Sequence, residues 1–136
     1  TSASARRGEA AGSGAGRTIA PSRRTPSIIR WAVAKAARAA AAIRARGPRT
    51  AIVKLGQQGC YIASNQAHTY VPAYPATQVV DTTGAGDVFN AACIFGHKKG
   101  WGIEKIGRFA NVAAALSTTS FGDLNYPTEQ EVKQFI

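Results

Sequence analysis

The sequence lacks long apolar runs, closely spaced cysteines and methionine. It has no run of about 18 consecutive apolar residues, the length that a membrane-spanning helix needs, and two basic residues interrupt its most apolar stretch, residues 31–43. Its two cysteines, Cys60 and Cys93, lie in separate apolar runs, without the spacing of a disulfide framework or zinc site. The chain begins with Thr1, so either a segment has been removed or the sequence is a fragment. We expect a soluble, cytoplasmic protein with no membrane partner.

Acidic residues are also few, and the basic excess is concentrated at one end. The 136 residues carry 17 Lys and Arg against 7 Asp and Glu. Residues 1–49 hold eleven basic residues and one acid, whereas residues 50–136 hold six of each. A neutral body with a basic leader does not show the basic face with interleaved aromatics that nucleic-acid recognition usually requires, so the charge argues against nucleic acid as a partner. The length allows one modest domain and excludes a two-domain enzyme.

Residues 1–26 are predicted to be a disordered, basic, low-complexity segment. They are mainly Ala, Arg, Gly, Ser and Thr, which cannot bury enough apolar surface to offset the entropy of ordering. The glycine run at 12–16 has no preceding strand and no following GK[ST], which favours a flexible segment over a phosphate loop. The Arg-rich composition is typical of an organelle transit peptide and equally of a GC-rich stretch translated in the wrong frame. Both interpretations stay open.

Residues 27–136 show the pattern of one α/β domain. Apolar residues at helical spacing predict a helix from Ser27 that Gly47-Pro48 ends. Short extended runs predict four strands, at residues 50–55, 60–64, 68–72 and 77–80. The first is typical of a strand covered on both faces, and the second begins a more mixed hairpin. Three more helices are predicted, at 86–99, at 103–119 and from Thr128, which forms a capping box with Glu131. The order of elements implies a layered α/β fold.

The most informative segment for function is Asp81-Thr82-Thr83-Gly84-Ala85-Gly86-Asp87. It joins a predicted strand to an apolar helix through residues that let a phosphate approach the backbone. The first turn of that helix offers unpaired N–H groups and the positive end of the helix dipole, so the segment is a candidate anion cradle. Asp87 then places a carboxylate beside a site suited to negative charge. Composition alone favours a simpler role for it, stabilising the helix dipole.

The same segment is similar to the second signature of the pfkB, or ribokinase-like, carbohydrate kinases. Residues 81–89 match the pattern D-[ST]-T-G-A-G-D-x-F without a mismatch. Residues 53–59 resemble the family's G-x-x-G strand and turn, and residues 109–115 resemble its late nucleotide-side helix. The resemblance covers residues 28–136 and implies the C-terminal nucleotide-binding part of a ribokinase-like three-layer sandwich.

The resemblance implies an ATP-dependent phosphotransferase that acts on an alcohol group of a sugar or related polyol. Asp87 would be the general base, and the backbone N–H groups of Gly84, Ala85 and Gly86 would form the anion hole. GxxxxGK[ST] is absent, as it is from the family, so the anion hole and Mg²⁺ would stabilise the transferring phosphate. The implied small-molecule substrate is a sugar or nucleoside.

Gly56 and Gly59 are carried over as ATP-side residues. Lys54 matches a position from which a lysine could reach a phosphate, although a lysine at a strand end is usually only solvated. Asn111 matches a position near the adenosine, although an asparagine within a helix can instead cap a backbone group.

Many family members also bind a monovalent cation, such as K⁺, beside the anion hole. The matching groups are Asp81 and the backbone of Thr83, helped by the loop near Ser120 and Gly122. An Asx-type turn at the strand end explains Asp81 equally well.

The chain departs from the family in length. Family members are considerably longer, and their sugar-binding residues lie in an N-terminal half that this sequence does not contain. We therefore keep three hypotheses: part of a sugar or nucleoside kinase, a truncated and inactive fragment that binds nucleotide or a partner, and a basic leader that binds nucleic acid. A homodimer of the full-length parent and organelle import of the chain stay open. An incomplete sheet would expose apolar edges, so we expect poor stability in isolation.

Overall fold

The computed structural model describes residues 21–76, 78–121 and 126–136. Within these residues the chain forms two compact units. The first comprises residues 21–55 and 61–70, and the second comprises residues 56–60 and the described residues from 71 onward. Most of the predicted disordered segment, residues 1–20, lies outside the described residues.

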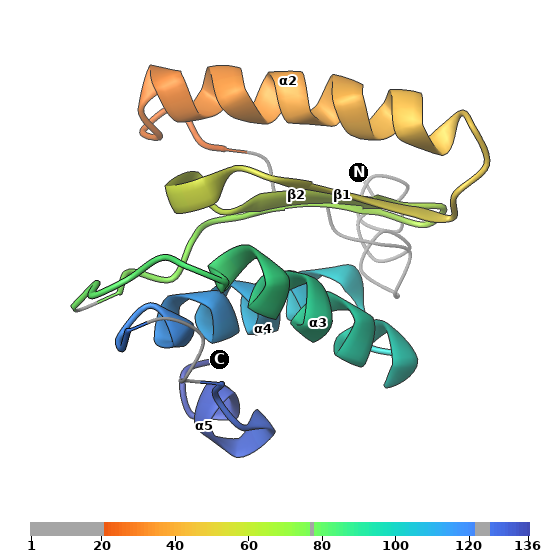
Figure 1. The fold of residues 1–136 in the computed structure, drawn as a ribbon. Coiled ribbons are helices and arrows are strands. Elements are labelled where there is room, and N and C mark those ends of the chain that lie inside the picture. The colour runs from red at the N-terminus through yellow and green to blue at the C-terminus, as the bar shows by residue number, and fades with distance from the viewer. Residues whose placement is uncertain (1–20, 77, 122–125) are drawn as a thin grey trace, which may run out of the picture. The chain divides into compact units, whose positions relative to one another are not determined.

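The first unit is a helix packed on a small sheet. Helix α2 (Ser27–Arg44) precedes strands β1 (Thr50–Lys54), β2 (Cys60–Ser64) and β3 (His68–Val71), which pair in the order β1-β2-β3. The strands are joined by connections too short for a parallel crossover, so they form an antiparallel meander (Figure 1). One side of α2 packs on the sheet, where small side chains allow a close approach; the buried core residues are Val33, Ala36, Ala40, Ala51, Tyr61, Ala63 and Tyr70.

The helix ends much as the sequence predicts. The amide of Gly47 donates to the carbonyl of Arg44 at 3.0 Å, and Gly47 has φ +125°. A residue with a side chain is strained at that angle, whereas glycine is not. Glycine followed by proline therefore turns the chain from α2 toward β1.

Two predictions about strand burial were wrong. β1 was expected to be covered on both faces, yet Ile52 and Val53 are only half-buried, because β1 lies at an edge of the sheet. β2 was expected to be mixed, yet its residues 60–63 are all buried, because it is the central strand. Sheet position, which periodicity does not reveal, decides burial here.

The predicted strand at 77–80 is also absent from residues 78–80, the part of it that the structure describes. No neighbouring strand pairs with it among the described residues, and the Val79 side chain is 57% exposed. Instead, the amides of Val80 and Asp81 both donate to the carbonyl of Thr118, at 2.7 and 3.1 Å. An extended run without a partner strand has no ladder of hydrogen bonds to form.

The second unit is built mainly from helices α3 (Ala85–Lys98), α4 (Ile103–Ser117) and α5 (Glu129–Lys133), together with the short 3₁₀ turn η1 (Gly56–Gln58). α3 and α4 pack closely at Gly96, where an added Cβ would lie 2.9 Å from Cγ1 of Ile106 and 3.1 Å from Cε3 of Trp101. Phe95, Trp101 and Phe109 form an aromatic cluster with centroids 5.1–5.7 Å apart. This packing holds α3 and α4 together.

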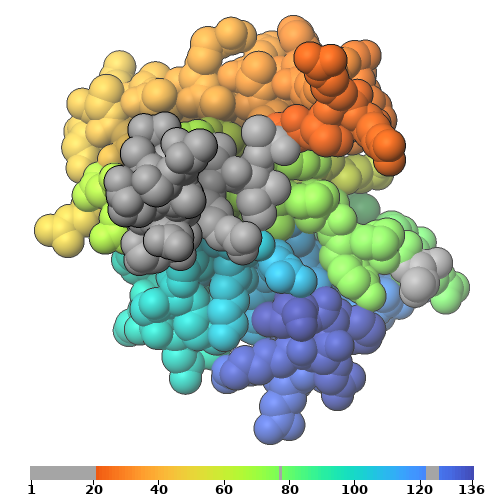
Figure 2. Space-filling view, turned by 180° about the vertical axis from the view of Figure 1, so that it is seen from behind, coloured from red at the N-terminus to blue at the C-terminus, as the bar shows by residue number. Residues whose placement is uncertain are grey.

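The start of α5 confirms the predicted capping box. The Thr128 hydroxyl accepts from the Glu131 amide at 3.3 Å, and a Glu131 carboxylate oxygen accepts from the Thr128 amide at 2.6 Å. Figure 2 shows α5, in dark blue, at the surface beside α4. In the part of the chain that the structure describes, no helix is long and apolar enough to cross a membrane.

Candidate active site

The turn before α3 needs glycine. Gly84 is the N-cap residue and has a left-handed backbone, φ +78°. The amide of Ala85 donates to the carbonyl of Thr82 at 3.2 Å, and the amide of Val88 donates to the carbonyl of Gly84 at 3.0 Å. The amides of Gly84 and Gly86 have no acceptor among the residues that the structure describes. Two of the three amides expected in the anion hole are therefore available to a ligand, while that of Ala85 is already engaged.

Asp81 holds the beginning of this turn. Its Oδ1 accepts hydrogen bonds from the amide of Thr83 at 2.9 Å and from the Thr83 hydroxyl at 2.7 Å. This is the Asx-type turn that was one of the two explanations for Asp81. In the loop that follows α4, the Oγ atom of Ser120 is buried with no hydrogen-bond partner in the described residues. Gly122, named with Ser120 for the cation loop, lies outside the described residues.

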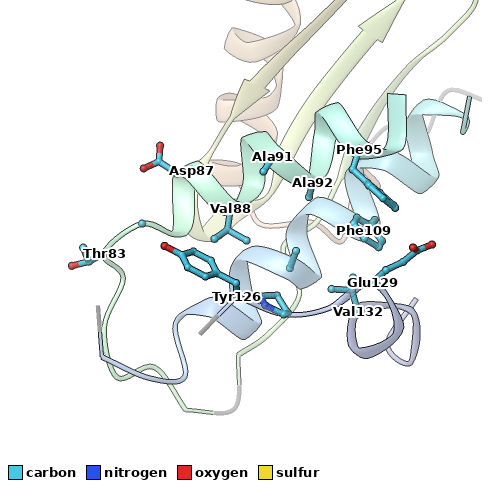
Figure 3. Close-up of a pocket in the computed structure, with 13 residues that line it drawn as sticks. Thr83, Asp87, Val88, Ala91, Ala92, Phe95, Phe109, Tyr126, Glu129 and Val132 are labelled. Carbon is cyan, nitrogen blue, oxygen red and sulfur yellow. The ribbon is translucent and has the colours of Figure 1, made fainter. Parts of the chain in front are cut away.

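The carboxylate of Asp87 lies at the rim of a cavity of about 780 Å³ within the second unit. Asp87 is exposed, in the first turn of α3, and its side chain points away from the apolar wall (Figure 3). That wall comes from three helices and from the segment before α5; its apolar side chains are Val88, Ala91, Ala92, Phe95, Phe109, Ala113, Tyr126, Pro127 and Val132. An exposed acid beside free amides can receive a proton from a bound hydroxyl group.

The G-x-x-G turn forms η1 and the bend after it. Gly56 has φ +58° and open space around it, whereas Gly59 has φ +103° and lies against the backbone of residues 71–73. A Cβ on Gly59 would lie 2.1 Å from the carbonyl oxygen of Val71. Both glycines are thus required by backbone conformation, and Gly59 is also required by close packing.

Asn111, on α4, forms hydrogen bonds with residues 71–72, which are part of the segment that lies against Gly59. It is buried, and its Nδ2 donates to the carbonyl oxygens of Val71 at 3.2 Å and Pro72 at 2.9 Å. This is the backbone-capping alternative for Asn111, and its contact with adenosine stays a prediction. Lys54 is exposed at the end of β1 and belongs to the first unit, whereas the other candidates belong to the second.

The cysteines are buried and free, as expected of small apolar residues. Burial and, to a lesser extent, the nearby Cys93 raise the pKa of the Cys60 thiol to about 12, although a hydrogen bond with Asn111 opposes the shift. A thiol with so high a pKa is not a nucleophile at neutral pH. His68 accepts or donates a hydrogen bond with the Tyr61 hydroxyl at 2.9 Å, and His97 lies in the last turn of α3. Neither histidine lines the cavity.

Sequence reasoning missed the walls of the cavity. Tyr126 and Val132 were not considered, and Phe109, which is 5% exposed, was named only as part of the segment 109–115. These side chains come from separate helices and meet only through tertiary packing, so no local motif marks them. The one signal was the capping box at Thr128, which fixes where α5 begins and hence where Val132 lies.

Comparison with known proteins places the chain in a family. The sequence profile described as "pfkB family carbohydrate kinase" matches residues 21–130. The ribokinase of Bacillus subtilis is 40% identical over 90 residues, which cover 65% of this chain and 30% of that protein. The chain spans about 30% of the length of the curated relatives it matches.

Solved structures agree with the sequence match. The ribokinase of Arabidopsis thaliana, complexed with ribose and ATP, superposes with a TM-score of 0.66 at 33% identity, covering 73% of this chain and 32% of that one. A protein of Escherichia coli named as a ribokinase II, in complex with ATP and Mg²⁺, gives a TM-score of 0.67 at 33% identity, covering 73% and 32%. The partial α/β fold is therefore ribokinase-like, and the chain belongs to the pfkB family of carbohydrate kinases.

Proposed function

We propose that the chain is the nucleotide-binding part of an ATP-dependent phosphotransferase that acts on an alcohol group of a sugar, nucleoside or related polyol. The observation that carries the proposal is the geometry of residues 84–87. Glycine in a left-handed conformation begins α3, two amides beside it have no acceptor among the described residues, and the carboxylate of Asp87 is exposed at the rim of the cavity. Donors and a base are thus held on one helix turn.

The chemistry divides between these groups. The amides of Gly84 and Gly86 would donate to the phosphoryl group as negative charge grows on it; losing one donor of this kind typically lowers turnover about 10²–10³-fold. The Asp87 carboxylate would accept the proton of the attacking hydroxyl group, a contribution of about 10²–10⁴ in rate. The amide of Ala85 already donates to the carbonyl of Thr82. Ala85 would therefore help to hold the turn and would not donate to the phosphoryl group.

ATP and Mg²⁺ are the proposed cofactors. The described residues contain no cluster of three His, Cys, Asp or Glu side chains that could hold a metal ion. Mg²⁺ does not need such a cluster, because it is usually bound through one or two carboxylates together with substrate phosphates and water. When bound, the ion would neutralise charge on the phosphates. Gly56, Gly59, Asn111 and Lys54 are proposed to border the nucleotide.

A monovalent cation is proposed beside the same turn. Asp81 and the backbone of Thr83 would bind it, and Ser120 would contribute its Oγ atom, which is buried without a partner in the described part of the chain. An oxygen atom buried in this way costs free energy unless a ligand satisfies it.

A second function is favoured by the length of the match. The chain spans about 30% of its curated relatives, so it can bind nucleotide without turning over an acceptor. Both functions leave residues 27–136 as one part of a kinase domain. The homodimer of a longer parent, a cytoplasmic location and organelle import remain proposals.

The experiment uses the chain of residues 1–136 with MgATP. Calorimetry measures ATP binding, and ADP release is followed with ribose, fructose and a nucleoside as acceptors. Phosphorylation that Asp87→Asn removes while ATP still binds supports the phosphotransferase. ATP binding without turnover on any acceptor supports the second function. Absence of ATP binding by a folded chain overturns both.

A further inference from the structure

The two units differ in charge. In the first unit, the described residues contain nine Lys and Arg side chains and no Asp or Glu; the sequence has no acidic residue between Glu9 and Asp81. In the second unit, the described residues contain five basic and five acidic side chains. Much of the positive charge at the N-terminal end therefore belongs to a folded unit and not to a leader. Self-repulsion in such a unit is relieved when an external anion binds.

Helix α2 presents part of this charge on one face. Its inner side, with Val33, Ala36 and Ala40, packs in the core. On the opposite side Arg30, Trp31, Lys35 and Arg38 are all exposed, and we call these four residues the basic face of α2. In the space-filling view, the orange to yellow atoms of α2 lie at the surface along the helix (Figure 2). The face is therefore accessible in the first unit.

The spacing of the basic face suits a chain of phosphates. From Arg30 to Arg38 the helix rises about 12 Å, and phosphate charges recur about every 3.4 Å along a stacked nucleic-acid strand. The three cations can thus neutralise about three or four successive phosphates. The intervening residues include Ala34, which is small and lets a strand approach.

Trp31 supplies what a purely electrostatic patch lacks. Its side chain is 61% exposed, and the Nζ atom of Lys35 lies over its ring, 4.3 Å from the ring centroid. An exposed indole beside cations is the combination that single-strand binding sites use, because a base stacks on the ring while the cations contact the backbone. The sequence analysis disfavoured nucleic acid as a partner because no basic face with an interleaved aromatic residue was evident. The basic face of α2 contains such a residue, Trp31.

We propose that the basic face of α2 binds single-stranded nucleic acid, with the phosphates on Arg30, Lys35 and Arg38 and one base on Trp31. An anionic membrane is the alternative polyanion, and the fold disfavours it. Helices that lie in a membrane interface bury an apolar face among the lipids, whereas the apolar side of α2 is already packed on its own sheet. Besides Trp31, the large apolar side chains of α2 that are exposed are Ile28, in its first turn, and Ile43, in its last turn.

Fluorescence anisotropy of a labelled oligothymidylate of about 20 nucleotides, titrated with the full chain, tests the proposal. In the triple variant R30Q/K35Q/R38Q we expect affinity to fall on the order of tenfold or more at low salt, and the slope of log K against log salt to shrink by about 2. Trp31→Ala should weaken binding about 5- to 150-fold, the loss expected for one stacked base. Helix content by circular dichroism verifies that both variants remain folded.

The matched control is K98Q/K99Q/R108Q, which removes the same charge from exposed positions of the second unit. It should bind oligothymidylate almost as tightly as the unaltered chain. An equal loss in control and triple variant would mean that net charge alone acts, and this would overturn the proposal. Unchanged binding by the triple variant would do so as well, because it would move the site to residues 1–20. So would binding to phosphatidylserine vesicles without binding to the oligonucleotide.

Discussion

The two glycines of the G-x-x-G turn offer a matched pair for testing why this turn needs glycine. Gly56 and Gly59 both have positive φ, +58° and +103°. They differ in surroundings, because an added Cβ has nothing within 4 Å at Gly56 but lies 2.1 Å from the carbonyl oxygen of Val71 at Gly59. The same substitution to alanine therefore separates backbone strain from steric overlap.

The expected free energies follow from these surroundings. Gly56→Ala should lower the free energy of unfolding by about 1–2 kcal/mol, the strain of a side chain in the left-handed region. Gly59→Ala should add an overpacking cost of about 1–3 kcal/mol, because the overlapping atoms are backbone and cannot rotate away. The total, about 2–5 kcal/mol, is a large part of the roughly 5–15 kcal/mol that stabilises a typical domain.

Urea unfolding followed by far-ultraviolet circular dichroism measures both variants. We expect the midpoint of Gly59→Ala to lie well below that of Gly56→Ala, and the loss of a cooperative transition in Gly59→Ala alone would fit the same reasoning. The side-chain amide resonances of Asn111, which donates to the neighbouring carbonyls of Val71 and Pro72, should shift in Gly59→Ala only. Equal losses of stability in the two variants would refute the argument from packing.

Three further predictions concern the carboxylate proposed as the general base, a buried thiol and a helix cap. Asp87→Asn should lower any phosphotransferase turnover about 10²–10⁴-fold while calorimetry shows ATP affinity nearly unchanged; an active variant would exclude Asp87 as the base. The folded-state pKa of Cys60 is raised to about 12 from 9.0, so its contribution to stability is complete below about pH 9 and is lost as the pH rises toward 12, by about 1.4 kcal/mol per pH unit. Urea midpoints that fall as steeply in Cys60→Ala would contradict this. Thr128→Ala should cost about 1 kcal/mol and speed hydrogen exchange in α5; unaltered exchange there would show that packing of Val132 alone holds the helix.

The local features of the fold could be predicted from the sequence. α2 follows from apolar spacing and from the glycine that ends it, and α5 follows from the capping box of Thr128 and Glu131, because caps and periodicity act within a few residues. The strand at 77–80 was wrong for the opposite reason. Its residues favour an extended backbone, yet a strand also requires a partner, and that partner is not a local property.

In the candidate site, too, contiguous residues could be predicted from the sequence, whereas contacts between distant residues could not. The glycine turn and Asp87 are contiguous, so the motif predicts them together, and the structure describes a turn of that kind. Asn111 shows the limit. Its residue type allows either a ligand contact or a backbone cap, and only the positions of Val71 and Pro72, forty residues away in the chain, reveal the hydrogen bonds that it makes.

The close contact at Gly96 couples the packing of α3 to the position of its N-terminal end. Asp87 lies nine residues before Gly96, about 13 Å along the helix axis, and Gly96 is the point at which α3 rests on Ile106 and Trp101. A larger residue there would push α3 away from Ile106 and Trp101 and displace its N-terminal end, which carries Asp87. We therefore expect a substitution at the opposite end of α3 to change any phosphotransferase turnover, although it leaves every residue proposed to contact the phosphate intact.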